Sequence, residues 1–243
     1  MKITLSYSGG TSRGRQLACG LDKRGMLQEF YTPAYHPLAD FIPHKLRPHS
    51  AGLDLHKVRA NPPIKYFRGL MSLTRKLRGA KLTERYYITN LIDRWVSSNL
   101  CVGADILLAE SQIALNSIRR AKQLGMITIL DRTNSHIVYQ SQVVDEELQA
   151  MGVSWKTNSQ RVIDKGLKEY QEADYIFTLS SYVTRTFVAK GVPIQKIRQV
   201  PSGIDLSRFK PVIKEDNIFR VIYCGALQGK KGTHYLLRAF AEL

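Results

Sequence analysis

The first 32 residues, MKITLSYSGGTSRGRQLACGLDKRGMLQEFYT, decide the fold. Residues 3–7 predict a short apolar strand, and the turn GGTSRG at 9–14 is rich in small residues. Residues 15–24 predict a helix, which Gly25 closes as a left-handed cap, and residues 26–32 predict a second strand. A strand, a glycine-rich turn, a helix and a strand in this order open a parallel α/β sheet.

The same alternation continues through the rest of the chain. Further strands are expected over residues 104–110, 126–131, 174–180 and 196–203. Helices are expected over residues 83–101, 111–124, 137–150, 159–172 and 182–190. We therefore expect an α/β chain with a Rossmann-like parallel sheet and helices on both of its faces.

The C-terminal part of the chain predicts a second unit. Residues 1–205 are expected to form one domain, 206–217 an interdomain linker and 218–243 the start of another domain. In that start, FRVIYCG (219–225) predicts a strand, and a second glycine-rich turn and a helix follow. One strand and one helix cannot bury a core of their own. We therefore expect the chain to be a fragment whose second domain is incomplete.

Positive charge gathers in the first half of the chain. The net charge is +16, and the first 100 residues carry 17 of the 36 basic side chains but 6 of the 20 acidic ones. Residues 33–63 contain six prolines and predict a long irregular excursion. Residues 64–78 predict a basic amphipathic helix. Its uses could be peripheral membrane contact, binding of an anionic acceptor, or simple packing on the sheet with a solvated basic face, and vesicle co-sedimentation tests the first.

Several classes of protein are excluded or disfavoured. No apolar run is long enough for a membrane span, and the start of the chain lacks the apolar core of a signal peptide. The three distant cysteines fit neither a disulfide framework nor a metal site. The second strand ends without the acidic residue that a dinucleotide fold needs, which disfavours an NAD-dependent oxidoreductase. No Walker sequence is present. Aromatic and basic residues do not interleave as they do in nucleic-acid-binding modules. We expect no cofactor, no metal, no nucleic-acid partner and a cytoplasmic location.

Two glycine-rich turns are candidate anion sites. Gly9 and Gly10 lie between a strand and a helix, where backbone amides can approach a phosphate; a tight turn with no ligand is the alternative. Lys230 and Lys231 precede the last helix, where two ammonium groups would favour a diphosphate; a solvated surface pair is the alternative. Arg13 is a further candidate near the phosphate or the acceptor.

Four segments of the chain, two of which overlap, resemble glycosyltransferase family 4. VPSGIDLSRFKP (200–211) and FRVIYCGALQGKKGTHYLLRAFAEL (219–243) are similar to the interdomain region and the start of its second domain. ADYIFTLSSYVTRTFVAKGVPIQKIRQVPSGID (173–205) is similar to the end of its first domain, and the N-terminal 25 residues to its opening. The resemblance is thin over 33–100. It implies a GT-B fold, in which two Rossmann-like domains enclose a nucleotide-sugar.

The resemblance implies retaining transfer of a sugar to a glycan, lipid or small-molecule acceptor. The diphosphate would be held by the first turn at Gly10 and by Lys231. The family commonly has arginine after the glycine of the second turn, where this chain has Ala226, and Lys230 would supply that charge. His136, on the loop after the strand that ends at Asp131, would lie near the transferring sugar; a histidine at a helix start, with Asn134 or Ser135 as N-cap, is the alternative.

Fixed positive groups on the leaving diphosphate would be the main catalytic device, so the paired carboxylates of glycoside hydrolases are not required. The family's acidic motif lies farther into the second domain than this chain reaches, so we expect the 243-residue chain to be inactive as a transferase. Two other classes stay open: another GT-B sugar-nucleotide enzyme such as an epimerase, and a non-catalytic domain that binds anions or the inner face of a membrane.

Overall fold

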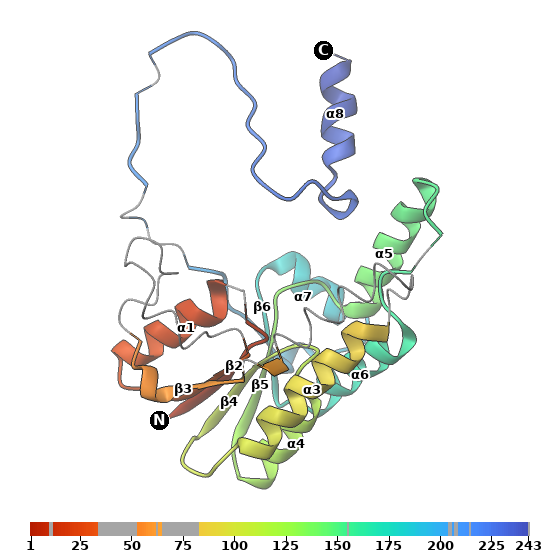
Figure 1. Cartoon of the computed structure of the whole chain (residues 1–243). Helices are drawn as coiled ribbons and strands as arrows, with labels where there is room; N and C mark the ends of the chain where they lie inside the picture. Colours follow the sequence, from red (N-terminus) through yellow and green to blue (C-terminus); the bar gives the residue numbers. More distant parts are fainter. Residues whose placement is uncertain are drawn as a thin grey trace.

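The chain folds around one parallel β-sheet (Figure 1). The computed structural model describes residues 1–9, 12–33, 53–61, 63–64, 83–154, 156–203, 206, 209–213 and 215–242. Its strands are β1 (Ile3–Ser6), β2 (Leu27–Thr32), β3 (Val58–Ala60), β4 (Ile106–Glu110), β5 (Ile127–Arg132), β6 (Tyr175–Thr178) and β7 (Ile197–Gln199). All neighbouring pairs are parallel, and the order is β3-β2-β1-β4-β5-β6-β7. The first six strands follow the order of a Rossmann fold, so the predicted fold class is confirmed.

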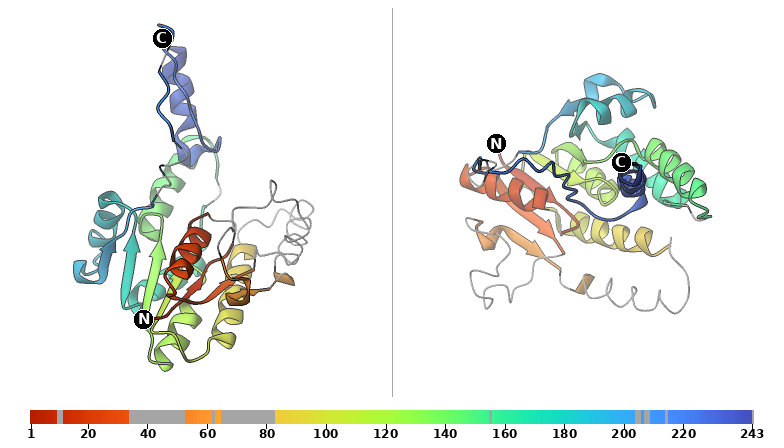
Figure 2. Two further views of the ribbon diagram at one scale, coloured as in Figure 1. Left: turned by 90° about the vertical axis from the view of Figure 1, so that its left-hand side faces the viewer. Right: turned by 90° about the horizontal axis from the view of Figure 1, so that it is seen from above.

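The described helices lie between successive strands on the two faces of the sheet, except the last one, which follows β7. They are α1 (Ser12–Lys23), α3 (Thr83–Asn99), α4 (Leu115–Gln123), α5 (Ile137–Ala150), α6 (Gln160–Glu172), α7 (Ser181–Val188) and α8 (Thr233–Ala241). Short 3₁₀ turns occur at η3 (Leu55–Lys57), η4 (Ile194–Lys196) and η6 (Gly229–Lys231). Helices α3, α4 and α6 pack side by side on one face, and α1 covers β1 and β2 on the other (Figure 2).

Alternate residues of the strands belong to two buried hydrophobic clusters, one on each face of the sheet. Leu107, Leu130 and Ile176 point toward the larger cluster, beneath α3, α4 and α6. Leu5 and Leu108 belong to the smaller cluster, which α1 covers. Strands buried on both faces are typical of parallel sheets. This explains why the strands are short apolar runs in the sequence.

Helix α1 lies unusually close to β1. A Cβ atom added at Gly14 would lie 2.6 Å from Cγ of the buried Tyr7 ring. Gly14, which the sequence suggested as part of the glycine-rich turn, therefore lies inside α1 and permits tight helix–sheet packing. Gly25 has φ of 65°, as its expected role as a left-handed cap requires.

Two expectations about secondary structure were wrong. The stretch 33–63 was expected to be irregular, but residues 58–60 form β3, whose Val58 pairs with Phe30 of β2. Strand β3 has only three residues and lies at the edge of the sheet, where two of them are exposed. It therefore lacks the apolar run that marks the buried strands in the sequence. The expected strand over 219–225 pairs with no described strand; its side chains are exposed along the extended segment that leads to α8 (Figure 1). The expected basic helix over 64–78 lies outside the described residues except for Ile64.

Candidate functional site

The sheet has its topological switch point between β1 and β4, because the chain winds from β1 outward to β3 and then continues at β4 on the other side. Ligands of open α/β sheets bind in the crevice outside the carboxyl ends of the strands at such a point. Here Ser8 donates both its backbone N–H and its hydroxyl to Oε2 of Glu110, each at 2.7 Å. Gly9 follows with φ of 82°, in the left-handed region. A half-buried carboxylate therefore marks the switch point.

A second carboxylate, Asp131 at the end of β5, lies beside it. The Tyr7 hydroxyl donates to Asp131 Oδ2 at 2.6 Å, and Arg13 donates from Nε to Oδ2 at 2.8 Å and from Nη2 to Oδ1 at 3.1 Å. Arg13 also donates from Nη1 to the Ser202 hydroxyl at 3.0 Å. Asp131 is 1% exposed. This cluster ties β1, α1 and β5 to the turn after β7.

The charges in this cluster are already paired. Burial, together with the Asp131 carboxylate, raises the pKa of Tyr7 far above its usual value, so the phenol remains a hydrogen-bond donor. The Arg13 side chain is 14% exposed and its guanidinium faces Asp131. A phosphate placed there would have to compete with that carboxylate. The proposed role of Arg13 near the phosphate or acceptor therefore stays a prediction.

The N-terminus of α4 is closed by protein carboxylates. The Ala114 N–H donates to Glu169 Oε1 at 2.9 Å, and the Ser117 N–H donates to Asp93 Oδ1 at 2.9 Å. Lys165 forms an ion pair with Asp93 at 3.1 Å. Burial raises the pKa of Glu169 to about 7. Helix N-termini are common anion sites, but these two carboxylates already bind amides in the first turn of α4.

His136 is buried and serves as the N-cap of α5. The His136 carbonyl accepts the Gln140 N–H at 2.8 Å, so the cap is His136 and not Asn134 or Ser135. The backbone N–H of His136 donates to the Thr186 hydroxyl at 3.0 Å. The ring is 3% exposed and lies 5.0 Å from the Tyr170 ring and 5.1 Å from the Phe187 ring, centroid to centroid. Burial, helped by the nearby Arg132, lowers the pKa of His136 to about 4, so the imidazole is neutral at pH 7.

One nitrogen of the neutral imidazole, Nδ1 of His136, is buried without a hydrogen-bond partner among the described residues. The ring lies among aromatic side chains rather than at the surface. Its proposed place near the transferring sugar stays a prediction.

Lys230 and Lys231 occupy η6, and Gly232 follows with φ of 66° as the N-cap of α8. Both lysines are exposed, and neither ammonium group forms an ion pair with a described residue. Gly10 lies outside the described residues. Among the described residues, no hydrogen bond or ion pair joins the first turn to this lysine pair.

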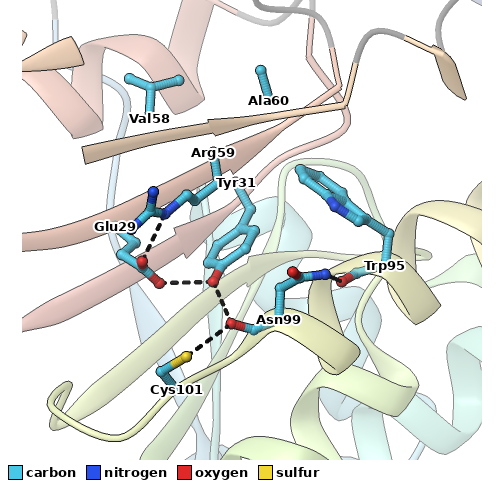
Figure 3. A pocket seen from close by; sticks show the side chains of 8 residues that line it. All are labelled: Glu29, Tyr31, Val58, Arg59, Ala60, Trp95, Asn99 and Cys101. Carbon is cyan, nitrogen blue, oxygen red and sulfur yellow. Dashed lines mark hydrogen bonds and ion pairs between the residues drawn. The ribbon is translucent and has the colours of Figure 1, made fainter. Parts of the chain in front are cut away.

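A cavity of about 460 Å³ lies between α3 and the β2–β3 edge of the sheet (Figure 3). Arg59 Nε donates to Glu29 Oε1 at 2.8 Å, and the Tyr31 hydroxyl lies 2.7 Å from both Glu29 Oε2 and the Asn99 carbonyl. These polar groups therefore bind one another across the cavity wall. Its lining consists of Glu29, Tyr31, Val58, Arg59, Ala60, Trp95, Asn99 and Cys101.

Among the described residues, no group of three or more His, Cys, Asp or Glu side chains could hold a metal ion. No described helix is long and apolar enough to cross a membrane.

No family model and no curated protein matches the chain. Solved structures do match it, and the three described below are each 13% identical to it. The apo form of the lipopolysaccharide outer core galactosyltransferase WaaB has a TM-score of 0.42 and 13% identity, over 89% of this chain and 50% of its own. Anabaena HepE in complex with UDP-glucose has a TM-score of 0.46 and 13% identity, over 85% of this chain and 45% of its own.

Phytolacca americana UGT2, complexed with UDP-2-fluoro-glucose and pterostilbene, has a TM-score of 0.45 and 13% identity, over 89% of this chain and 56% of its own. This chain thus spans about half the length of the solved structures that it matches.

Sequence reasoning missed the carboxylates of this site, although a signal existed. Glu110 and Asp131 come at the ends of two apolar runs, ILLAE and ITILDR, that form neighbouring strands. The carboxyl ends of parallel strands meet at one edge of a sheet. Acidic residues at the ends of successive apolar runs can therefore be recognised in the sequence as lying at the same edge of the sheet.

Proposed function

We propose that this chain belongs to a retaining glycosyltransferase that moves a sugar from a nucleotide-sugar to a glycan, lipid or small-molecule acceptor. The observation that carries the proposal is the exposed Lys230–Lys231 pair in the turn before α8, free of ion pairs with described residues. Two such groups beside a helix N-terminus suit a diphosphate. The Pro-Ser-Gly-Ile-Asp turn (201–205) that precedes this pair supports the same proposal.

The chemistry of sugar transfer gives each group a role. Breaking the bond between a sugar and a diphosphate places negative charge on the leaving group, which the ammonium groups of Lys230 and Lys231 would stabilise. His136 is neutral at pH 7 and could offer a hydrogen bond to a sugar without adding a charge, but α5 separates it by roughly 21 Å from the lysine pair, so it does not share the diphosphate site in this arrangement. The half-buried Glu110 at the end of β4, whose Oε2 accepts from Ser8, is an acceptor suited to a hydroxyl group of a sugar acceptor, whereas the buried Asp131 serves to hold Tyr7 and Arg13.

Donor binding tests this proposal. Isothermal titration of the 243-residue chain with UDP-glucose, the ligand of the HepE complex, should show binding. A Lys230→Ala/Lys231→Ala double variant should weaken it by roughly 10-fold to 100-fold, because charge-assisted hydrogen bonds contribute about 1.5–3 kcal/mol. Lys210→Ala, which removes one exposed charge from the linker, is the control and should bind like the wild type. Equal affinity of the double variant and the wild type would refute the proposed role of the pair.

A further inference from the structure

Helix α8 is fastened to α5 through a single carboxylate. His234 Nε2 lies 2.8 Å from Glu147 Oε1, and the Tyr235 hydroxyl donates to Glu147 Oε2 at 2.9 Å. The His234 and Tyr235 rings also contact each other, with centroids 4.1 Å apart and their planes tilted by 42°. Both oxygens of Glu147 are therefore engaged by neighbouring side chains at the start of α8.

This contact lies where the C-terminal segment returns to the body of the protein. The described residues of 206–228 are exposed along their whole length. Figure 1 shows them as an extended segment that leads away from the sheet to α8. Helix α8 has nine residues, and isolated helices shorter than about 12–15 residues are marginal in water. The start of α8 is held by this contact with α5 and by a 3.3 Å hydrogen bond from the Thr233 hydroxyl to the Tyr223 hydroxyl, so its stability depends on both.

The same contact places the lysine pair. A Cβ atom added at Gly229 would lie 3.3 Å from Sδ of Met151, the C-cap of α5, so η6 packs against the end of that helix. His136 is the N-cap at the other end of α5. The helix spans 14 residues, or roughly 21 Å at 1.5 Å per residue. Helix α5 therefore has the buried imidazole of His136 at its N-terminal end and the turn with Lys230 and Lys231 packed at its C-terminal end.

We propose that Glu147 is a positioning residue that fixes the Lys230–Lys231 turn on the helix that begins at His136. The docking of α8 follows from the contacts alone. The consequence for donor binding rests on the function proposed above.

Hydrogen–deuterium exchange of the 243-residue chain tests the docking. In Glu147→Ala, amides of residues 233–241 should exchange roughly tenfold faster or more, while the amides of the sheet keep their wild-type rates. Glu146→Ala is the matched control, because Glu146 accepts from Gln142 of its own helix at 3.0 Å and should leave α8 protected. Wild-type protection of α8 in Glu147→Ala would overturn the proposal.

Donor affinity tests the positioning. UDP-glucose should bind Glu147→Ala roughly tenfold more weakly. Glu147→Gln keeps an oxygen for the Tyr235 hydroxyl and should recover part of both the affinity and the protection of α8. Release of α8 in Glu147→Ala with unchanged affinity would overturn the positioning role. If the wild type binds no nucleotide-sugar, the function proposed above fails, and the exchange experiment alone decides whether Glu147 fixes the turn.

Discussion

The buried imidazole of His136 should make the protein sensitive to acid. Its pKa is lowered to about 4 in the folded chain, against 6.5 for an unperturbed histidine. As the pH falls below 6.5, the unfolded chain therefore takes up this proton before the folded chain can. The stabilising contribution is complete above pH 6.5 and is lost progressively toward pH 4. Linkage gives a loss of about 2 kcal/mol between pH 7 and pH 5 from this one group.

Urea unfolding followed by far-UV circular dichroism at pH 7 and pH 5 measures this loss. Wild type should lose about 2 kcal/mol more than His136→Gln over that interval, because the variant has no imidazole at this position. Using the difference between the two proteins removes the contribution of carboxylates that also titrate. His56→Gln, which changes an exposed histidine, is the matched control. Equal losses in wild type and His136→Gln would refute the reasoning.

Two further predictions concern stability, measured by urea or thermal unfolding. Gly14→Ala should cost about 1–3 kcal/mol because its methyl group would meet the Tyr7 ring at 2.6 Å, whereas Gly20→Ala in the same helix has no atom closer than 3.9 Å and should be neutral or stabilising. Asp131→Asn leaves the largely buried guanidinium of Arg13 without its counter-charge and should lower the free energy of unfolding by about 3 kcal/mol. Asp105→Asn, at the surface, should change it by less than about 1 kcal/mol. Similar losses in both variants would contradict the assigned burial.

Local sequence patterns were sufficient to predict most of the sheet. The apolar runs expected at residues 3–7, 26–32, 104–110, 126–131 and 174–180 became strands, because strands covered on both faces of a sheet are largely apolar. The pattern failed at the margins of the sheet. Residues 58–60 are short and half polar, and they form a strand only because β2 offers a free edge. Residues 219–225 have a strong strand pattern, but a strand also requires a neighbour, and no described strand pairs with them.

The site was harder to predict than the fold. The exposure of Lys230 and Lys231 followed from their place in a polar turn. In contrast, the partners of Arg13 lie 118 and 189 residues away in the chain, and such pairings depend on the order of the strands. The burial of His136 likewise comes from the rings of Tyr170 and Phe187, which local sequence cannot place beside it.

The cap on α4 has a consequence for synthesis of the chain. Glu169, which binds the Ala114 amide, is translated 55 residues later. At roughly 5–20 residues per second, a ribosome needs several seconds to cover that stretch. During this interval the first turn of α4 lacks one of its two acidic partners. The first turn of α4 can therefore complete its cap only after α6 has emerged, and truncated nascent chains ending before Glu169 should expose the β4–α4 junction to proteases and chaperones.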